Sequence, residues 1–293
     1  MKDLPPTEAV NPHSAGLDTM ATHEMVELLA REHRAAVDAV AAAAPALALA
    51  VDGIVRRLES GGRLHYFGAG SSGRIGVLDA SEMPPTFGTD PATVCAHIAG
   101  GSQALTRAVE GAEDDAAAGA AAAQACASAG DAVVGLSASG GAPYVVGAVE
   151  RARELGAFTI GIAGVEDSAL TRAAEVSILL TTGPEALAGS TRLKAGTAQK
   201  IALNTLSTAV MVRLGKVYDN LMVDVVAGNV KLRARAIRLV RHLTGADEER
   251  ARELLSMANG RVKVAAIIGR RNVGAQEAVA LLERHRGSLR AAL

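Results

Sequence analysis

Short apolar runs alternate with longer amphipathic stretches between residue 62 and about residue 230 of this chain. Each run is continuous and partly β-branched, which is typical of a strand covered on both faces. Strands that alternate with helices pair in parallel through right-handed crossovers. The pattern therefore predicts an α/β fold with a parallel sheet whose strands lie at residues 64–67, 93–98, 132–136, 159–162 and 176–180.

Helical periodicity fills the intervals between these runs. An alanine-rich tract at 116–123 continues the helical pattern, so we interpret it as part of a close-packed helix. The predicted helices of this region are 74–79, 103–128, 143–155, 168–174 and 195–214.

The two ends of the chain differ from this central region. Residues 1–20 are polar and rich in proline, and we interpret them as an extended arm. Residues 21–60 carry helical periodicity, with Pro45 expected to separate two helices. Residues 233–293 are rich in arginine and leucine, with breaks at Gly245, Gly260 and Gly274, which predicts three or four short helices. We therefore expect an α/β domain at 61–232 and a small C-terminal all-helical domain at 233–293.

Charge and composition exclude several classes of partner. The net charge is -1 and no long basic run is present, which argues against a nucleic-acid surface. Aromatic residues make up 2% of the chain, so stacking platforms for sugars or bases are not expected. No apolar run approaches the roughly 20 residues of a membrane helix, and residues 1–14 lack the apolar region that a secretory signal would show, so we do not expect them to be one. These features predict a cytoplasmic protein without membrane contacts.

The cysteines and histidines suggest no cofactor. Cys95 and Cys126 lack the spacing of a disulfide framework or a metal site, and we expect both to be small buried hydrophobic residues. His65 and His97 lie within predicted strands, and we expect them to be satisfied residues in or near the core. The sequence therefore predicts neither a bound metal nor another cofactor.

Glycine and serine mark three turns at which a helix is expected to begin. Serine hydroxyls and the backbone N–H groups of a helix start both suit a phosphate dianion. One such turn also serves as a simple helix cap, but two on successive parallel strands and a basic third segment favour phosphate. None matches a nucleotide-binding loop. The turns are 68–73, with Ser71 and Ser72; 137–141, with Ser137 and Ser139; and 189–194, with Ser190, Arg192 and Lys194.

Two glutamates near these turns are candidates for acid–base chemistry. Glu82 precedes Pro84 and Pro85, and Glu113 is expected to share a helix face with Glu110. The alternative for Glu82 is a helix-terminal carboxylate that makes structural hydrogen bonds. The alternative for Glu113 is a solvated helix face. Pattern alone leaves both alternatives open.

Several long motifs resemble those of the N-acetylmuramic acid 6-phosphate etherases. Departures are mild, such as Ser71 where threonine is common and Leu193 in place of methionine. The resemblance runs nearly end to end. The motifs are GAGSSGR (68–74), LDASEMPPTFG (78–88), VEGAED (109–114), SASGGAPYV (137–145), GSTRLKAGTAQK (189–200) and NLMVDVVAGNVKL (220–232).

The resemblance implies a sugar-isomerase (SIS) type three-layer α/β/α sandwich, a small C-terminal helical domain and a homodimer with sites near the subunit interface. It implies cleavage of the D-lactyl ether of N-acetylmuramic acid 6-phosphate to N-acetylglucosamine 6-phosphate and D-lactate in cell-wall recycling, without a cofactor. By matching motifs, Glu82 and Glu113 are the catalytic carboxylates. Ser72, Ser137 and Ser139 hold the phosphate. Lys194 would complement the phosphate or the lactate carboxylate, although a structural salt bridge is equally compatible with its position.

The chemistry of the ether explains why two carboxylates are useful. In the open-chain sugar the proton at C2 is α to an aldehyde, and its removal allows lactate to leave C3. Water then adds at C3 and C2 is reprotonated. One group must act as a base at C2 and another as an acid at the ether oxygen. We assign the acid to Glu82 and the base to Glu113, although the opposite assignment fits the sequence as well.

Two other functions use the same phosphate turns. An aldose–ketose isomerase needs one base, whereas the paired motifs around Glu82 and Glu113 favour an etherase. A sugar-phosphate sensor resembling glucokinase regulatory protein or SIS-bearing transcription factors would carry a second SIS module or a DNA-binding domain, and this chain shows neither.

Overall fold

The computed structural model describes residues 5–225 and 230–293, and its contacts divide the chain into two units. The first unit comprises Met1–Ser81 and Ala92–Ser207, and the second comprises Glu82–Pro91 and Thr208–Leu293. The sequence pattern placed a boundary near residue 232, where the arginine-rich helices begin. Residues 1–4 of the arm and 226–229 of the motif at 220–232 lie outside the described residues.

A parallel five-stranded sheet forms the centre of the first unit, with strand order β2-β1-β3-β4-β5. All five predicted strands are confirmed, and each end lies within one residue of its prediction. Continuous burial along β1 and β3 explains why their sequences are apolar rather than alternating. The strands are β1 (Leu64–Gly68), β2 (Val94–Ile98), β3 (Ala132–Leu136), β4 (Phe158–Ala163) and β5 (Val176–Leu179).

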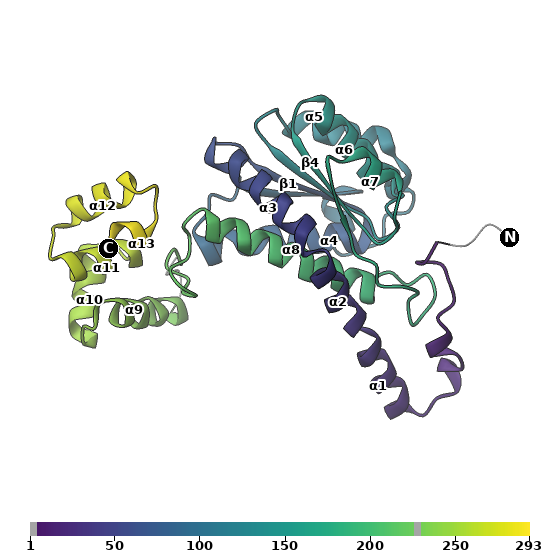
Figure 1. The fold of residues 1–293 in the computed structure, drawn as a ribbon, viewed down its shortest axis with the longest axis horizontal. Coiled ribbons are helices and arrows are strands. Elements are labelled where there is room, and N and C mark those ends of the chain that lie inside the picture. Colours follow the sequence, from purple (N-terminus) through teal and green to yellow (C-terminus); the bar gives the residue numbers. More distant parts are fainter. Residues whose placement is uncertain (1–4, 226–229) are drawn as a thin grey trace. The chain divides into compact units, whose positions relative to one another are not determined.

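Helices cover both faces of this sheet, which confirms the three-layer α/β/α sandwich (Figure 1). Helices α3, α4 and α8 lie on one face, and α5, α6 and α7 lie on the other. Their bounds are α3 (Ala44–Glu59), α4 (Gly70–Phe87), α5 (Ala116–Cys126), α6 (Pro143–Glu154), α7 (Ala169–Ala173) and α8 (Lys194–Arg213).

A buried carboxylate joins the sheet to two of these helices. Asp79 of α4 accepts hydrogen bonds from Tyr66 Oη of β1 at 2.9 Å, Asn204 Nδ2 at 2.6 Å and Ser207 Oγ at 3.0 Å, the last two from α8. Burial raises the pKa of Asp79 above its usual value, and the three donors oppose that rise. This cluster fixes α4 against α8 next to β1.

The helix predicted over 103–128 is confirmed for its second half, α5, which includes the alanine-rich tract, and is wrong for its first half. The segment consists of two short 3₁₀ helices, η3 (Gly101–Leu105) and η4 (Ala112–Asp114), followed by α5. Gly111, inside the predicted range, adopts φ +71°, a left-handed conformation that interrupts a right-handed helix. Asp115 caps α5 by accepting from Ala118 N at 2.8 Å.

Helix α4 is longer than the predicted helix at 74–79 and contains Pro84 and Pro85. Among the N-terminal helices, α1 (Thr22–Glu32), α2 (Arg34–Ala42) and α3, the predicted break near Pro45 is confirmed. A further break at His33 was not predicted. Within the described residues, no single helix is long and apolar enough to cross a bilayer, and one bent pair, Thr22–Ala42 with Ala44–Glu59, passes on length and composition only.

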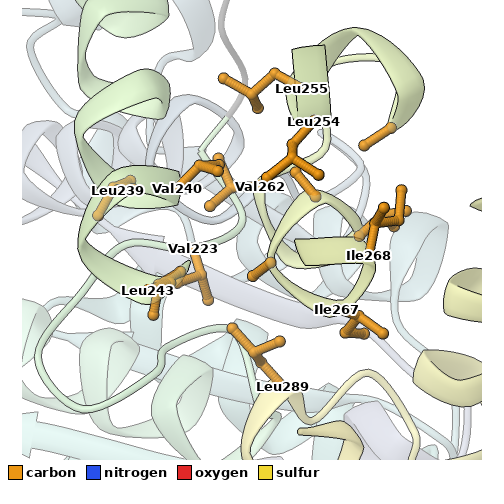
Figure 2. Packing of buried hydrophobic residues seen from close by; sticks show 14 of the residues in the cluster. Val223, Leu239, Val240, Leu243, Leu254, Leu255, Val262, Ile267, Ile268 and Leu289 are labelled. Carbon is orange, nitrogen blue, oxygen red and sulfur yellow. The ribbon is translucent and has the colours of Figure 1, made fainter. Parts of the chain in front are cut away.

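The second unit has an apolar core of its own, formed by side chains of five helices and the segment that precedes them (Figure 2). The predicted breaks at Gly245, Gly260 and Gly274 are confirmed. From residue 230 to residue 293 the structure describes five helices, whereas three or four were predicted. Asp247 caps α10 by accepting from Arg250 N at 2.8 Å. The helices are α9 (Val230–Thr244), α10 (Glu248–Met257), α11 (Val262–Arg271), α12 (Ala275–Arg284) and α13 (Leu289–Ala292).

A buried lysine crosslinks this unit. Lys263 Nζ of α11 donates to Asp224 Oδ2 at 2.5 Å and to the carbonyl oxygens of Gly215 and Gly287, each at 2.8 Å. Burial lowers the pKa of Lys263, while the carboxylate of Asp224 opposes that shift. The ammonium group therefore links α11 to the segment after α8 and to the turn before α13.

Candidate active site

The strand order creates a switch point between β1 and β3. The chain moves from β1 outward to β2, and then returns to β3 on the other side of β1. In open parallel sheets, ligands bind beyond the carboxyl ends of the strands at such a point. The first two serine turns follow β1 and β3, so the fold brings these two predicted phosphate turns to neighbouring strand ends.

The turn after β1 is tightly built. A Cβ atom at Gly68 would lie 2.6 Å from the backbone nitrogen of Gly73, so only glycine permits this approach. Helix α4 then begins at Gly70, which places Ser71 and Ser72 in its first turn. Helix starts expose backbone N–H groups that bind anions. Ser71 is half-buried and Ser72 is buried.

The turn after β3 has the same character. Ser137 is buried and Ser139 is exposed. Ser139 Oγ accepts from Gly141 N at 3.2 Å, and Ser137 Oγ lies 3.5 Å from Ala142 N. Gly140 adopts φ +68°, and a Cβ there would overlap the side chain of Ser168. Both hydroxyls are therefore held at the start of α6.

The third turn contacts the first through α8. Gln199, in the second turn of α8, accepts from Ser72 Oγ at 2.8 Å. Gln199 is buried, and its Nε2 has no hydrogen-bond partner among the described residues. A buried amide donor without a partner is costly and calls for an explanation. Its position beside Ser72 makes Gln199 a candidate ligand contact that sequence reasoning missed.

The charges at the start of α8 are already paired. Lys194 Nζ, which is buried, donates to Glu32 Oε2 of α1 at 2.8 Å. The backbone N–H groups of Lys194 and Ala195 donate to the carboxylate of Glu185 at 3.0 and 2.9 Å. The carboxylate of Glu185 thus occupies this helix start. The structure assigns Lys194 to an ion pair, and Ser190 is half-buried beside it.

Glu82 and Glu113 are both exposed. Glu82 lies in α4 and belongs to the second unit, whereas Glu113 lies in η4 and belongs to the first. Among residues 5–225 and 230–293, no hydrogen bond or ion pair holds either carboxylate. The expected shared helix face of Glu110 and Glu113 was wrong, because Glu110 lies in the turn before η4. Both carboxylates are therefore available to a ligand.

Named proteins from other organisms are similar to this chain over nearly its whole length. A protein from Deinococcus radiodurans named N-acetylmuramic acid 6-phosphate etherase is 52% identical over 294 residues, which cover 100% of this chain and 96% of the relative. A relative of the same name from Gloeobacter violaceus is 54% identical over 288 residues, covering 98% of this chain and 94% of the relative. The chain belongs to the N-acetylmuramic acid 6-phosphate etherase family.

Family models and solved structures place the etherase fold among sugar-isomerase (SIS) domains. The model of the SIS domain matches residues 113–209, and that of the glucokinase regulatory protein N-terminal SIS domain matches residues 46–153. A phosphoheptose isomerase from Francisella tularensis superposes with a TM-score of 0.54 at 21% identity, covering 66% of this chain and 100% of that one. A phosphoheptose isomerase from Neisseria gonorrhoeae superposes with a TM-score of 0.50 at 18% identity, covering 64% of this chain and 97% of that one. This likeness shows the fold.

An arginine of the GAGSSGR motif positions the segment that precedes Glu113 in this etherase-family chain. Arg74 Nε donates to the carbonyl oxygens of Ala104 and Leu105 at 2.9 and 3.2 Å, and its Nη2 donates to that of Arg107 at 3.1 Å. Three carbonyl groups of one loop are thus tied to the first turns of α4. The sequence had not marked Arg74, because its partners are loop carbonyls that carry no residue signature.

The histidines and cysteines differ from their predictions. His65 is buried as expected, but its Nε2 has no hydrogen-bond partner within the described residues. Cys95 and Cys126 are half-buried rather than fully buried. His65, His97 and Cys126 bring their side-chain donor atoms together, a grouping that linear spacing does not reveal.

A cavity of about 1050 Å³ lies within the second unit. It is lined by basic side chains, including Arg233, Arg252 and Arg261, and by none of the serines of the three turns. We locate the candidate active site of this etherase-family member at the switch point, because the turns with Ser72 and Ser137 lie there and the unpaired amide of Gln199 lies beside Ser72.

Proposed function

We propose that this chain is a carbon–oxygen lyase that cleaves the D-lactyl ether of N-acetylmuramic acid 6-phosphate to N-acetylglucosamine 6-phosphate and D-lactate. The observation that carries the proposal is identity above 50% to proteins named for this activity over nearly the full length of the chain. The serine turns at the β1/β3 switch point support it, because a sugar phosphate needs an anion-binding helix start.

In this proposal the substrate phosphate lies against the starts of α4 and α6. Ser71, Ser72, Ser137 and Ser139 donate hydroxyl hydrogen bonds, and backbone N–H groups of the first helical turns add to them. The amide of Gln199 supplies a further donor beside Ser72. Ser190 completes this group from the third turn.

Lys194 has a different part in the proposal from the one its motif implies. Its ammonium group is neutralised by Glu32, so it contributes little net positive charge to a phosphate. The pair links α1 to the start of α8 and thereby fixes the position of Gln199 and Ser190.

The two glutamates carry the chemistry in the proposal. Glu113 removes the C2 proton of the open-chain aldehyde, and the electron pair expels the C3 oxygen as lactate. Glu82 gives its proton to that departing oxygen and then takes one from the water that adds to C3. The return of a proton to C2 completes the product. The exposure of both carboxylates allows them to reach a bound sugar.

We further propose that the chain works as a cytoplasmic homodimer in peptidoglycan recycling, with sites near the subunit interface. The two cysteines form no disulfide, which suits a reducing compartment. With each site near the subunit interface, a partner subunit supplies one of its two carboxylates in this proposal.

Separate readouts of the two half-reactions test the roles of the glutamates. D-lactate release reports the whole reaction, and exchange of the C2 proton with solvent deuterium reports the base alone. We expect Glu82→Ala to lose lactate release by about 10²-fold or more but to retain exchange, and Glu113→Ala to lose both. The neighbouring exposed Glu110→Ala is the matched control and should keep both.

Exchange lost in Glu82→Ala and retained in Glu113→Ala would reverse the two roles. A wild-type protein that interconverts an aldose phosphate and a ketose phosphate without releasing lactate would be an isomerase, which would refute the proposed function.

A further inference from the structure

Three side chains that ligate transition metals meet on the α5 face of the sheet. His65 comes from β1, His97 from β2 and Cys126 from the last position of α5. His65 Nδ1 lies 3.2 Å from His97 Nε2, and His97 Nε2 lies 3.5 Å from Cys126 Sγ. The donor atoms of all three residues lie within 4.8 Å of one another. The proposed etherase reaction uses none of them.

These separations match the edges of a tetrahedral metal site. Zinc binds histidine nitrogen at about 2.0–2.1 Å and cysteine sulfur at about 2.3 Å. At the tetrahedral angle, those bond lengths place two nitrogens about 3.3 Å apart and a nitrogen and a sulfur about 3.6 Å apart. The observed distances of 3.2 and 3.5 Å are close to both values. The third edge, between His65 Nδ1 and Cys126 Sγ, is no longer than 4.8 Å, so two edges already have tetrahedral lengths and the third lies within reach of a side-chain rotation.

The carboxylate of Asp131 lies near the other ring nitrogen of His65. When Nδ1 faces the metal, the other ring nitrogen must carry the proton and needs an acceptor. His65 Nε2 lies 3.8 Å from Asp131 Oδ2 and has no other partner among the described residues. Asp131 is itself fixed, because it accepts from Arg63 N and from the backbone N–H and hydroxyl of Ser128. A small rotation of the His65 ring would bring this N–H within hydrogen-bond distance of the carboxylate, which would then orient the metal-bound imidazole.

The group is accessible from solvent and separate from the phosphate turns. His97 and Cys126 are half-buried, so an ion can enter, whereas His65 is buried. The serine turns follow the last residues of β1 and β3, whereas His65 is the second residue of β1. Cys95 pairs in register with His65, but its sulfur is not among the mutually close donor atoms. The group thus provides three protein ligands, which leaves a fourth position for water.

We propose that His65 Nδ1, His97 Nε2 and Cys126 Sγ bind one divalent ion of the zinc class, with water as the fourth ligand. The Cys126 thiol releases its proton to solvent on binding, and both imidazoles bind as neutral rings. The ion would crosslink β1, β2 and α5, so its expected effect is on the stability of the folded chain rather than on catalysis.

Titration of the untagged, chelator-treated protein with Co²⁺ alone tests this site. We expect one ion per chain, a thiolate-to-cobalt charge-transfer band in the near ultraviolet and the intense visible bands of tetrahedral cobalt, all abolished by added Zn²⁺. Cys126→Ser should remove the thiolate band, and His97→Gln should weaken binding tenfold or more. Cys95→Ser, the matched control, should retain the band and the affinity.

Thiol labelling of the wild-type protein gives a second measurement that needs no variant to fold. Zinc should protect Cys126 from alkylation, and the alkylation rate of Cys95 should be the same with and without zinc. The proposal is overturned by the absence of a thiolate band, by a band that survives Cys126→Ser, or by one that disappears in Cys95→Ser. Equal labelling of Cys126 with and without zinc would also overturn it, because the donors would then be joined by hydrogen bonds only.

Discussion

Ser72 and Gln199 illustrate what single residues contribute to the candidate site. Ser72 was recognisable from its place in a glycine-rich turn, since such turns have a local sequence signature. Gln199 was not, because its importance comes from a partner 127 positions away and from one amide nitrogen left without a partner. The ion pair of Lys194 could not be predicted for the same reason, since its partner Glu32 lies 162 positions away. Local patterns predict turns, whereas pairings across the chain become visible only in the fold.

Replacing Gln199 with methionine keeps the volume of the side chain and removes both polar groups. The substitution removes the acceptor of the Ser72 hydroxyl and the donor proposed for the phosphate. We expect KM for the sugar phosphate to rise about tenfold, since one hydrogen bond to a charged group contributes about 1.5 kcal/mol, with kcat little changed. Steady-state kinetics measure this directly.

Gln276→Met, at an exposed position of α12, is the control for the chemical change itself. An unchanged KM in Gln199→Met would show that the orphaned amide does not contact the substrate.

Among the elements, β1 and β3 were predictable because they are buried on both faces and contain few polar residues. Helix α4 was underestimated: it was expected over 74–79 and spans Gly70–Phe87, with Pro84 and Pro85 inside it. Residues 103–115 were mistaken for helix because their alanines and polar residues fit a helical period, whereas Gly111 adopts a left-handed conformation. A composition that permits helix does not show that each glycine is in a helical conformation.

Helices α5 and α6 pack so closely that a glycine is required between them. A Cβ atom at Gly119 of α5 would overlap the carbonyl oxygen of Tyr144 in α6. An alanine inside a helix normally stabilises it by about 1 kcal/mol relative to glycine. Here we expect Gly119→Ala to destabilise the protein by about 2 kcal/mol, because the backbone of α6 has to move. Denaturant unfolding measures the change in free energy.

Gly130→Ala is the matched control, because the nearest atom to a Cβ there is 3.9 Å away. Gly119→Ala should lower the unfolding midpoint well below that of Gly130→Ala, and equal midpoints would mean that α5 and α6 are not in such close contact.

For the molecule as a whole, the sequence showed two regions of different composition but not the boundary between the two units. The arginine-rich pattern begins near residue 233, whereas the second unit begins at Thr208, inside α8, and includes Glu82–Pro91. A single helix keeps one apolar period even where its neighbours change, so its sequence carries no sign of the division. Each unit has a cluster of buried apolar side chains of its own.

Lys263 allows the independence of the second unit to be tested. Lys263→Met removes a buried ammonium group and leaves Asp224 and two carbonyl groups short of a donor. We expect a loss of about 2 kcal/mol, since a buried partner is left unpaired while Lys216 still lies 3.5 Å from Asp224. Amide hydrogen exchange should show faster exchange in Thr208–Leu293 and unchanged exchange in Ala92–Ser207.

Arg271→Met, an exposed position on the same helix, should leave exchange unchanged in both ranges. An equal loss of protection in both units of Lys263→Met would show that they unfold together.

The most direct test of the proposed chemistry is the reaction of N-acetylmuramic acid 6-phosphate with the purified protein in H₂¹⁸O, followed by mass spectrometry of both products. Elimination and hydration break the bond between C3 and the ether oxygen, so ¹⁸O should enter the C3 hydroxyl of N-acetylglucosamine 6-phosphate and be absent from D-lactate. Labelled lactate with an unlabelled sugar would show cleavage on the lactyl side. That result, or a failure to release lactate at all, would contradict the account.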